Sequence, residues 1–232
     1  MGIFRNIFGG QPASPDSVTF DVSRYEFQGV RDGAKVWHTA DGDGLGIYFF
    51  RKRPDIPAGL TSTSQLRQSY SSALGNKFRV VDCRVQPLDK ISSVRLIIGG
   101  LDQKSSGAVF VGSFTIPFRD FSYVIKMQTH ESGVTGMRET ILVEQALRNG
   151  TGSMLDGKFV PNGWSFDDEQ FDALLPRHPL SRLRHELRLI AESVRIDEKV
   201  KRAEPFDLPQ DVTSLKLNLC QRKSASLRRS AS

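Results

Sequence analysis

The stretch FSYVIKMQTH, residues 121–130, alternates between two kinds of side chain and decides the fold. One set of alternate positions carries residues suited to a core: Phe121, Tyr123, Ile125, Met127 and Thr129. The intervening set is polar with a single exception: Ser122, Val124, Lys126, Gln128 and His130. A period of two is typical of a strand with one buried face. We therefore predict a strand whose apolar side lies against the core.

The flanking residues make this strand part of a β-β-α unit. We predict a strand over Val109–Ile116, a turn over Pro117–Asp120 and a helix over Met137–Arg148. Thr135 is the predicted N-cap of that helix, because a threonine hydroxyl can accept a hydrogen bond from the first helical turn. Glu139 then lies in the first turn, where its negative charge complements the helix dipole.

Similar patterns predict the other elements. Strands are predicted over Val36–His38, Leu45–Phe50, Phe78–Val85 and Val94–Ile98, and a helix over Ser62–Leu74. The clearest amphipathic helix begins at Pro179, and its apolar residues recur at intervals of three and four: Leu180, Leu183, Leu187, Ile190 and Val194. Each helix is expected to lay its apolar stripe on the sheet. We predict an α+β fold with a twisted, largely antiparallel sheet covered by helices.

Composition divides the chain of 232 residues into four segments. We predict an apolar N-terminal turn and linker over 1–17, an α/β sandwich domain over 18–150, a helical extension packing on that domain over 151–208, and a basic, mostly disordered tail over 209–232. The chain is long enough to bury a core without disulfides or a structural metal.

The net charge of +6 comes entirely from residues 177–232, which hold 13 basic and 7 acidic side chains. Five basic residues of the tail could contact an anionic surface: Lys216, Arg222, Lys223, Arg228 and Arg229. The apolar residues within 3–8 could dock on the domain or on a partner, be disordered, or act as a second weak membrane anchor. A peripheral membrane or anionic-surface protein is therefore one alternative, and a solubilising tail is the other.

The two cysteines, Cys83 and Cys220, lie far apart and share no motif, which favours a reducing, cytoplasmic setting. No apolar run approaches the roughly 20 residues of a membrane-spanning helix. The main domain has balanced charge and no identifiable recognition helix, so we expect no specific binding of nucleic acid.

No converging set of metal ligands, nucleotide-binding motif or nucleophile elbow occurs in the sequence. We therefore expect no metal, no cofactor and no catalytic residue. The enzymatic alternative is a hydrolase of unknown substrate that uses His130 with Glu131, or Cys83 or Ser113 with His38 or His130.

The turn that leads into the predicted helix at Met137 is the best candidate for a partner-binding site. It comprises Glu131, Gly133, Thr135, Gly136, Arg138 and Glu139. Free N–H groups at the helix start, together with Arg138, could hold an anionic group. The alternative is structural: the glycines form the turn, and Arg138 caps the helix or forms a salt bridge.

The run GSFTIPFRDFSYVIKMQTHESGVTGMRE, residues 112–139, together with HPLSRLR at 178–184, resembles uncharacterised bacterial proteins related to the PsbP-like, Mog-type α/β/α sandwich. The resemblance covers about residues 18–150. It implies a curved antiparallel sheet between helices, used as a non-catalytic docking surface. Members of that superfamily serve as a photosystem extrinsic subunit, as a Ran-binding import factor and as chaperones of secretion-system effectors.

The extension after residue 150 is not part of the superfamily pattern. The residues with which the Ran-binding members contact Ran cannot be matched to positions of this sequence. The resemblance therefore implies a kind of activity and names no partner. We expect a cytoplasmic, bacterial, non-catalytic module of the adaptor or chaperone type. Its partner is expected to be another protein.

Overall fold

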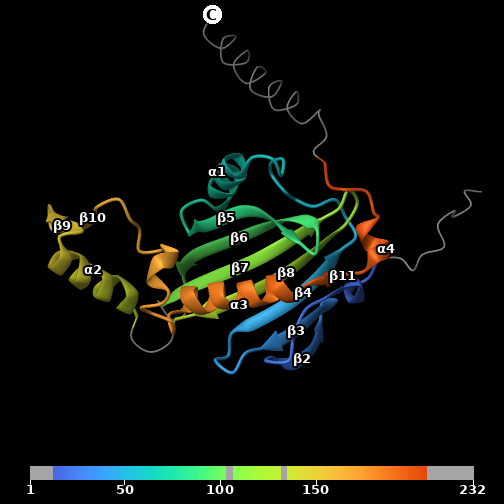
Figure 1. The fold of residues 1–232 in the computed structure, drawn as a ribbon, viewed down its shortest axis with the longest axis horizontal. Coiled ribbons are helices and arrows are strands. Elements are labelled where there is room, and N and C mark those ends of the chain that lie inside the picture. Colours follow the sequence, from blue (N-terminus) through green and yellow to red (C-terminus); the bar gives the residue numbers. More distant parts are fainter. Residues whose placement is uncertain (1–12, 103–106, 132–134, 208–232) are drawn as a thin grey trace, which may run out of the picture.

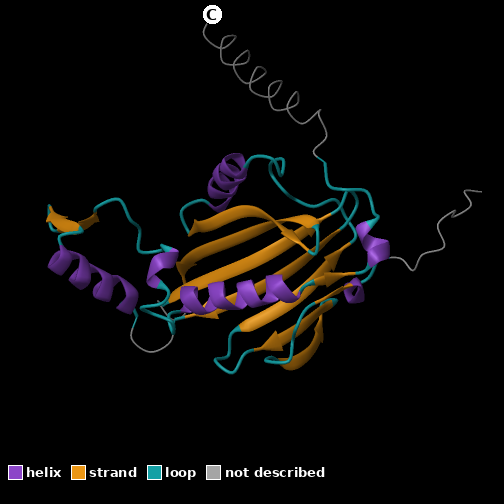
Figure 2. Ribbon diagram, viewed as in Figure 1, coloured by secondary structure: helices purple, strands orange, loops and turns teal. Residues whose placement is uncertain are grey.

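The structure, a computed structural model, describes residues 13–102, 107–131 and 135–207. Its centre is a seven-stranded antiparallel sheet (Figure 1). In spatial order the strands are β2 (Glu26–Arg31), β3 (Ala34–His38), β4 (Gly44–Phe50), β8 (Ser122–His130), β7 (Ala108–Pro117), β6 (Ile91–Leu101) and β5 (Phe78–Leu88). Helices pack on this sheet (Figure 2). The predicted fold class is confirmed.

The central strand β8 fixes which residues share a face. Ile125 lies opposite Ile47 of β4 and opposite Phe114 of β7. Tyr123, Ile125 and Met127 have no exposed surface. The alternation in the sequence therefore corresponds to a buried face of the sheet.

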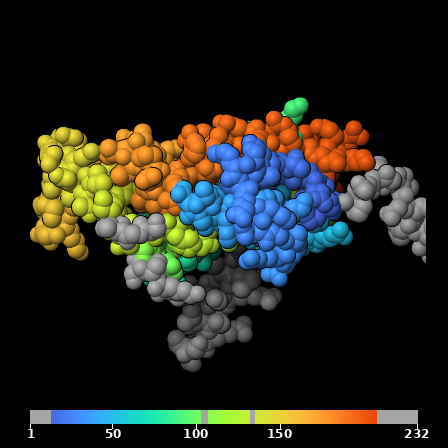
Figure 3. All heavy atoms as spheres, turned by 90° about the horizontal axis from the view of Figure 1, so that it is seen from below, coloured from blue at the N-terminus to red at the C-terminus, as the bar shows by residue number. Residues whose placement is uncertain are grey.

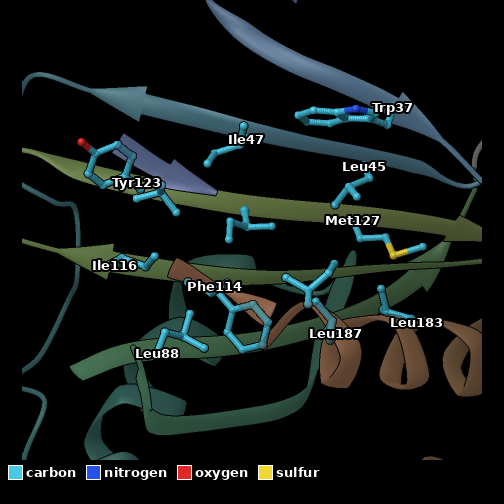
Figure 4. Packing of buried hydrophobic residues seen from close by; sticks show 14 of the residues in the cluster. Trp37, Leu45, Ile47, Leu88, Phe114, Ile116, Tyr123, Met127, Leu183 and Leu187 are labelled. Carbon is cyan, nitrogen blue, oxygen red and sulfur yellow. The ribbon is translucent and has the colours of Figure 1, made fainter. Parts of the chain in front are cut away.

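Helix α3 (Pro179–Ser193) covers that face, where it packs on β7 and β8. Figure 4 shows Leu183 and Leu187 pointing from α3 toward the sheet, with Leu187 beside Phe114. Gly112 permits the close approach, since a Cβ there would lie 2.5 Å from Leu187 Cδ1. All five apolar residues of the predicted stripe are buried. The first turn of α3 is capped by His178, whose Nδ1 accepts a hydrogen bond from the Leu180 N–H at 3.2 Å.

Helix α1 (Thr63–Leu74) packs on the opposite face, over β5. Ser62 caps its start by accepting a hydrogen bond from the Gln65 N–H. Leu66 is fully buried in a second apolar cluster with Val80 and Cys83. Arg67 donates to the carbonyl oxygen of Val80 at 2.9 Å and so occupies a backbone acceptor beside the edge of the sheet.

The two ends of the described chain meet in a small antiparallel pair. Strand β1 (Val18–Thr19) follows the short helix η1 (Pro15–Ser17) and pairs with β11 (Arg195–Ile196). The four-residue helix α4 (Glu198–Lys201) comes next, and its Lys201 forms an ion pair with Asp89 at 2.7 Å. The segment after α3 is thereby attached to the first residues of the fold.

Helix α2 (Met137–Asn149) forms a lobe with the hairpin of β9 (Gly152–Leu155) and β10 (Lys158–Pro161). The lobe projects at one end of the sheet (Figures 1 and 3). This differs from the expectation that the helix would lie on the sheet: α2 packs on β9, and its Leu142 and Ala146 are buried. An aromatic cluster links the hairpin to the short helix η2 (Glu169–Phe171), with contacts among Phe159, Trp164, Phe166 and Phe171.

Candidate binding surfaces

The predicted partner-binding turn is built around the carboxylate of Glu131. One oxygen accepts a hydrogen bond from the Gly136 N–H at 2.9 Å, and the other accepts one from the Ala108 N–H at 3.0 Å. The Glu131 N–H also donates to the Ala108 carbonyl at 2.8 Å. Glu131 therefore ties the end of β8, the start of β7 and the start of α2 together.

Arg138 is buried inside the same region, with 1% of its surface exposed. Its guanidinium donates to the carbonyl oxygens of Phe166 at 2.7 Å and Asp168 at 2.9 Å. It also donates to Ser181 Oγ at 3.0 Å and forms an ion pair with Asp172 at 3.2 Å. Burial lowers the pKa of Arg138. This geometry matches the structural alternative, in which Arg138 forms a salt bridge that holds α2 and α3 together.

The remaining residues of the predicted turn site are divided between surface and interior. Thr135 and Glu139 are exposed, whereas Gly136 is half-buried. Gly136, not Thr135, is the N-cap of α2, and its φ of +75° explains why a glycine is favourable there. Gly133 lies outside the described residues.

A groove of about 340 Å³ lies beside this turn, between the start of α2 and residues 174–179. Met137 and Leu174 line it and are 46% and 45% exposed. His178 forms part of the wall, where its ring contacts Phe110 edge to face. Burial, followed by the repulsion of Arg138, lowers the pKa of His178 to about 3. The His178 ring is therefore a neutral part of the wall at physiological pH.

The face of the sheet opposite α3 is a second candidate surface. The strand register places eight side chains of β4, β7 and β8 on it, which we call the open face: Tyr48, Phe50, Val111, Ser113, Thr115, Val124, Lys126 and Gln128. All eight keep part of their surface exposed, and Phe50 is 39% exposed. In the described part of the chain, α1 packs on this side of the sheet over β5 and leaves these positions accessible.

The open face combines an aromatic platform with a positive charge. The rings of Tyr48 and Phe50 stack with centroids 6.2 Å apart and an angle of 4°. The Tyr48 ring also lies flat over Gly46, since a Cβ at Gly46 would meet it at 3.1 Å. Lys126 lies directly opposite Gly46 on β8. The eight open-face positions include one cation and no carboxylate.

The residues of the enzymatic alternative are not assembled into one site. Cys83 lies on β5 in the apolar cluster under α1, and burial raises the pKa of its thiol. His38 lies on β3 and His130 on β8, so β6 and β7 separate β5 from β8. Ser113 is paired in register with Lys126. The Glu131 carboxylate is occupied by the two backbone N–H groups described above.

Several expectations concern residues that the structure does not describe. The anionic-surface residues Lys216, Arg222, Lys223, Arg228 and Arg229 and the apolar N-terminal turn lie outside the described ranges. Within those ranges, no group of three His, Cys, Asp or Glu side chains is placed to hold a metal ion. No described helix has the length and apolar character required to cross a membrane.

Sequence reasoning missed a network of charged side chains beside α3. Asp172 accepts from Arg138 and from Arg184, while Asp82 contacts Arg84 and Arg95. One signal was present: Arg95 interrupts the apolar run VRLII of β6. A charge at a core-facing strand position needs a partner, and that requirement could have drawn attention to it.

Comparisons with known proteins give the following result. No protein-family model matches the chain, and no curated protein matches its sequence. Among solved structures, the Ran-binding protein Mog1p of Saccharomyces cerevisiae has a TM-score of 0.43 and 9% identity, over 79% of this chain and 92% of Mog1p. LpqN of Mycobacterium tuberculosis, described as involved in cell envelope biogenesis, has a TM-score of 0.31 and 17% identity, over 60% of this chain and 82% of LpqN.

A protein of Bacteroides thetaiotaomicron has a TM-score of 0.35 and 8% identity over 53% of this chain. The match covers 41% of the Bacteroides protein, which is less than half of its length. At these similarities we transfer neither a family nor a function to this chain.

Proposed function

We propose that this protein is a non-catalytic protein-binding module that holds an acidic, amphipathic segment of a partner protein on its open face. The observation that carries the proposal is the contrast in burial along β8. Tyr123, Ile125 and Met127 are fully buried, whereas Val124 is half-buried and Lys126 is exposed. A core-forming strand in the middle of a sheet thus keeps one of its two sides available.

The chemistry of the open face supports a partner with both apolar and acidic side chains. The stacked Tyr48 and Phe50 rings offer flat apolar area, and aromatic side chains of this kind are enriched in protein interfaces. Lys126 forms no ion pair with a described residue. An acidic partner would therefore meet a free cation and no opposing carboxylate on the open face.

The exposed turn residues Thr135 and Glu139 are proposed as secondary contacts. They lie at the start of α2, next to the groove that Met137 and Leu174 line. In this proposal Glu131 and Arg138 position the turn and do not touch the partner, because their polar groups are already bonded within the protein.

Photo-crosslinking in the cells that produce the protein identifies the partner and tests the surface. A benzophenone amino acid at Tyr48 is compared with one at Gln145, which is exposed on α2. We expect one stoichiometric adduct at position 48 and none at position 145. Equal labelling from both positions, or no adduct at position 48, would contradict the proposal.

The identified partner is then purified and titrated with two charge-reversal variants. We expect Lys126→Glu to weaken binding about tenfold or more, because it places a carboxylate opposite the acidic segment. Lys158→Glu, an equal charge change on the exposed hairpin strand β10, should alter affinity less than about twofold. Both variants should keep the thermal midpoint of the parent, so that a loss of binding is not a loss of folding.

A further inference from the structure

A cavity of about 250 Å³ lies between α3 and the β5–β6 side of the sheet, on the face opposite to the open face. Five of its lining residues come from α3: Arg184 and Leu187 are buried, Ala191 is half-buried, and Arg188 and Glu192 are exposed. Arg95 of β6 and Phe114 of β7 lie on the sheet side. The cavity therefore joins charged groups to an apolar wall.

Arg95 and Arg184, which line this cavity, belong to ion pairs that contain more guanidiniums than carboxylates. Asp82 forms ion pairs with two guanidiniums, that of Arg84 at 3.0 Å and that of Arg95 at 3.4 Å. Asp172 likewise forms ion pairs with two guanidiniums, that of Arg184 at 3.1 Å and that of Arg138 at 3.2 Å. Two carboxylates thus pair with four guanidiniums, of which those of Arg95 and Arg184 line the cavity. Glu169 adds a more distant contact of 3.6 Å with Arg84, from an exposed position on the rim.

Two of these guanidiniums are buried and incompletely bonded. The side chains of Arg95 and Arg184 are 10% and 5% exposed. The Nε atoms of both are buried and form no hydrogen bond in the described structure, although the Nε of Arg95 lies 3.4 Å from a carboxylate oxygen of Asp82 in an ion pair. Burial lowers the pKa of Arg95, and Asp82 offsets this only in part. A buried donor without an acceptor costs free energy, and a bound acceptor would recover it.

We propose that this cavity binds a small monocarboxylate with an apolar body. The carboxylate would lie against Arg95 and Arg184, whose planar guanidiniums match its two oxygens. The apolar body would contact Phe114, Leu187 and Ala191.

The rim explains the preference for a single negative charge. Three exposed charged residues line the cavity: Glu169, Glu192 and Arg188. The two carboxylates outnumber the one exposed guanidinium, so they repel a dianion such as phosphate more strongly than a monoanion. The site is independent of the open face, because the two surfaces lie on opposite sides of the sheet.

Benzoate is the probe, and the full-length protein is titrated with it while the arginine Nε–H resonances are followed by NMR. We expect the signals of Arg95 and Arg184 to shift in a saturable manner, with a dissociation constant of about 1 mM. The Nε–H of Arg119, which is exposed and paired with Asp120, should not shift. This measurement uses the parent protein and does not depend on the folding of a variant.

Three further arms complete the test. Benzamide has the shape of benzoate without the charge, and inorganic phosphate has a charge without the apolar body; both should bind at least about tenfold more weakly than benzoate. Arg95→Met should weaken benzoate binding about tenfold or more, while Arg119→Met, which removes the same charge elsewhere, should not. Equal binding of benzamide or phosphate, or a benzoate titration in which the Arg95 and Arg184 signals stay unshifted, overturns the proposal.

Discussion

The two faces of one sheet differ sharply in how they are covered. On one face, Ile125 and its neighbours Ile47 and Phe114 are buried under α3. On the other, Val124 and Lys126, each one residue away along β8, keep exposed surface. The backbone of β8 is shared, so the difference comes from the side chains and from the layer above each face.

The alternation of side chains in a strand thus indicates which face is buried, but it does not indicate whether the exposed face binds a partner. The covered face needs apolar side chains because α3 removes it from water. The open face carries aromatic, aliphatic and polar residues together. A core face would be mainly apolar, and a face that contacts only water would be mainly polar. Surface that is partly apolar and not covered by a described element is where a partner gains most from binding.

The largest expected effect comes from truncating neighbouring residues on the two faces. Ile125→Ala should destabilise the fold by about 2–5 kcal/mol, because it removes buried methyl groups and leaves a cavity under α3. Val124→Ala, on the same strand, should cost about 1 kcal/mol or less, because its site is open. Urea unfolding measures both. Similar losses for the two variants would mean that the open face is covered in solution.

A smaller effect is expected from added volume. Gly112→Val should destabilise by about 1–3 kcal/mol, because the new side chain meets Leu187 and Leu183 where α3 approaches β7. The adjacent Ser113→Val, on the open face, should change stability by no more than about 0.5 kcal/mol. Thermal unfolding checks the pair. If Gly112→Val is tolerated equally well, α3 does not lie as close to β7 as described.

The smallest effect is a change in the pH dependence of stability. The pKa of His178 is about 3 in the folded protein, against 6.5 for an ordinary histidine. The unfolded chain therefore takes up a proton below about pH 6.5 that the folded protein resists, so the contribution of His178 is full above that pH and declines as the pH falls toward 3.

Replacement by asparagine separates this titration from the capping role. His178→Asn keeps an acceptor at the N-cap of α3 without an ionisable ring, so its unfolding free energy should fall less between about pH 7 and pH 4 than that of the parent. His130→Asn, at an exposed position of β8, is the matched control and should follow the parent curve. Denaturant midpoints across that range give the comparison. A parallel curve for His178→Asn would show that His178 titrates normally.

Local patterns predicted most of the elements. The alternation of β8 and the apolar stripe of α3 each depend on neighbours within a few residues, and both were placed correctly. The position of α2 was predicted wrongly, because its own apolar stripe fits any apolar surface and does not specify the sheet. Its packing on β9 depends on a hairpin that follows it and on the aromatic cluster around Trp164.

The candidate site was harder to predict than the fold. The sequence left two roles open for Arg138, binding of an anionic group or a structural salt bridge, and it could not identify the partners Phe166 and Asp172, which lie 28 and 34 residues further along the chain. Arg95 and Arg184 are likewise brought together across the gap between β6 and α3. No spacing rule connects such residues, since loops of any length can close the distance at modest entropic cost.

The sequence by itself determined which side chains share a face of a strand or helix, because backbone geometry repeats every two or 3.6 residues whatever surrounds it. Only the tertiary structure decided which of those faces is covered, where the α2 lobe projects and which arginines share a carboxylate. These outcomes depend on contacts between segments far apart in the chain, where the gain from burial is set by the assembled layers and not by any local run of residues.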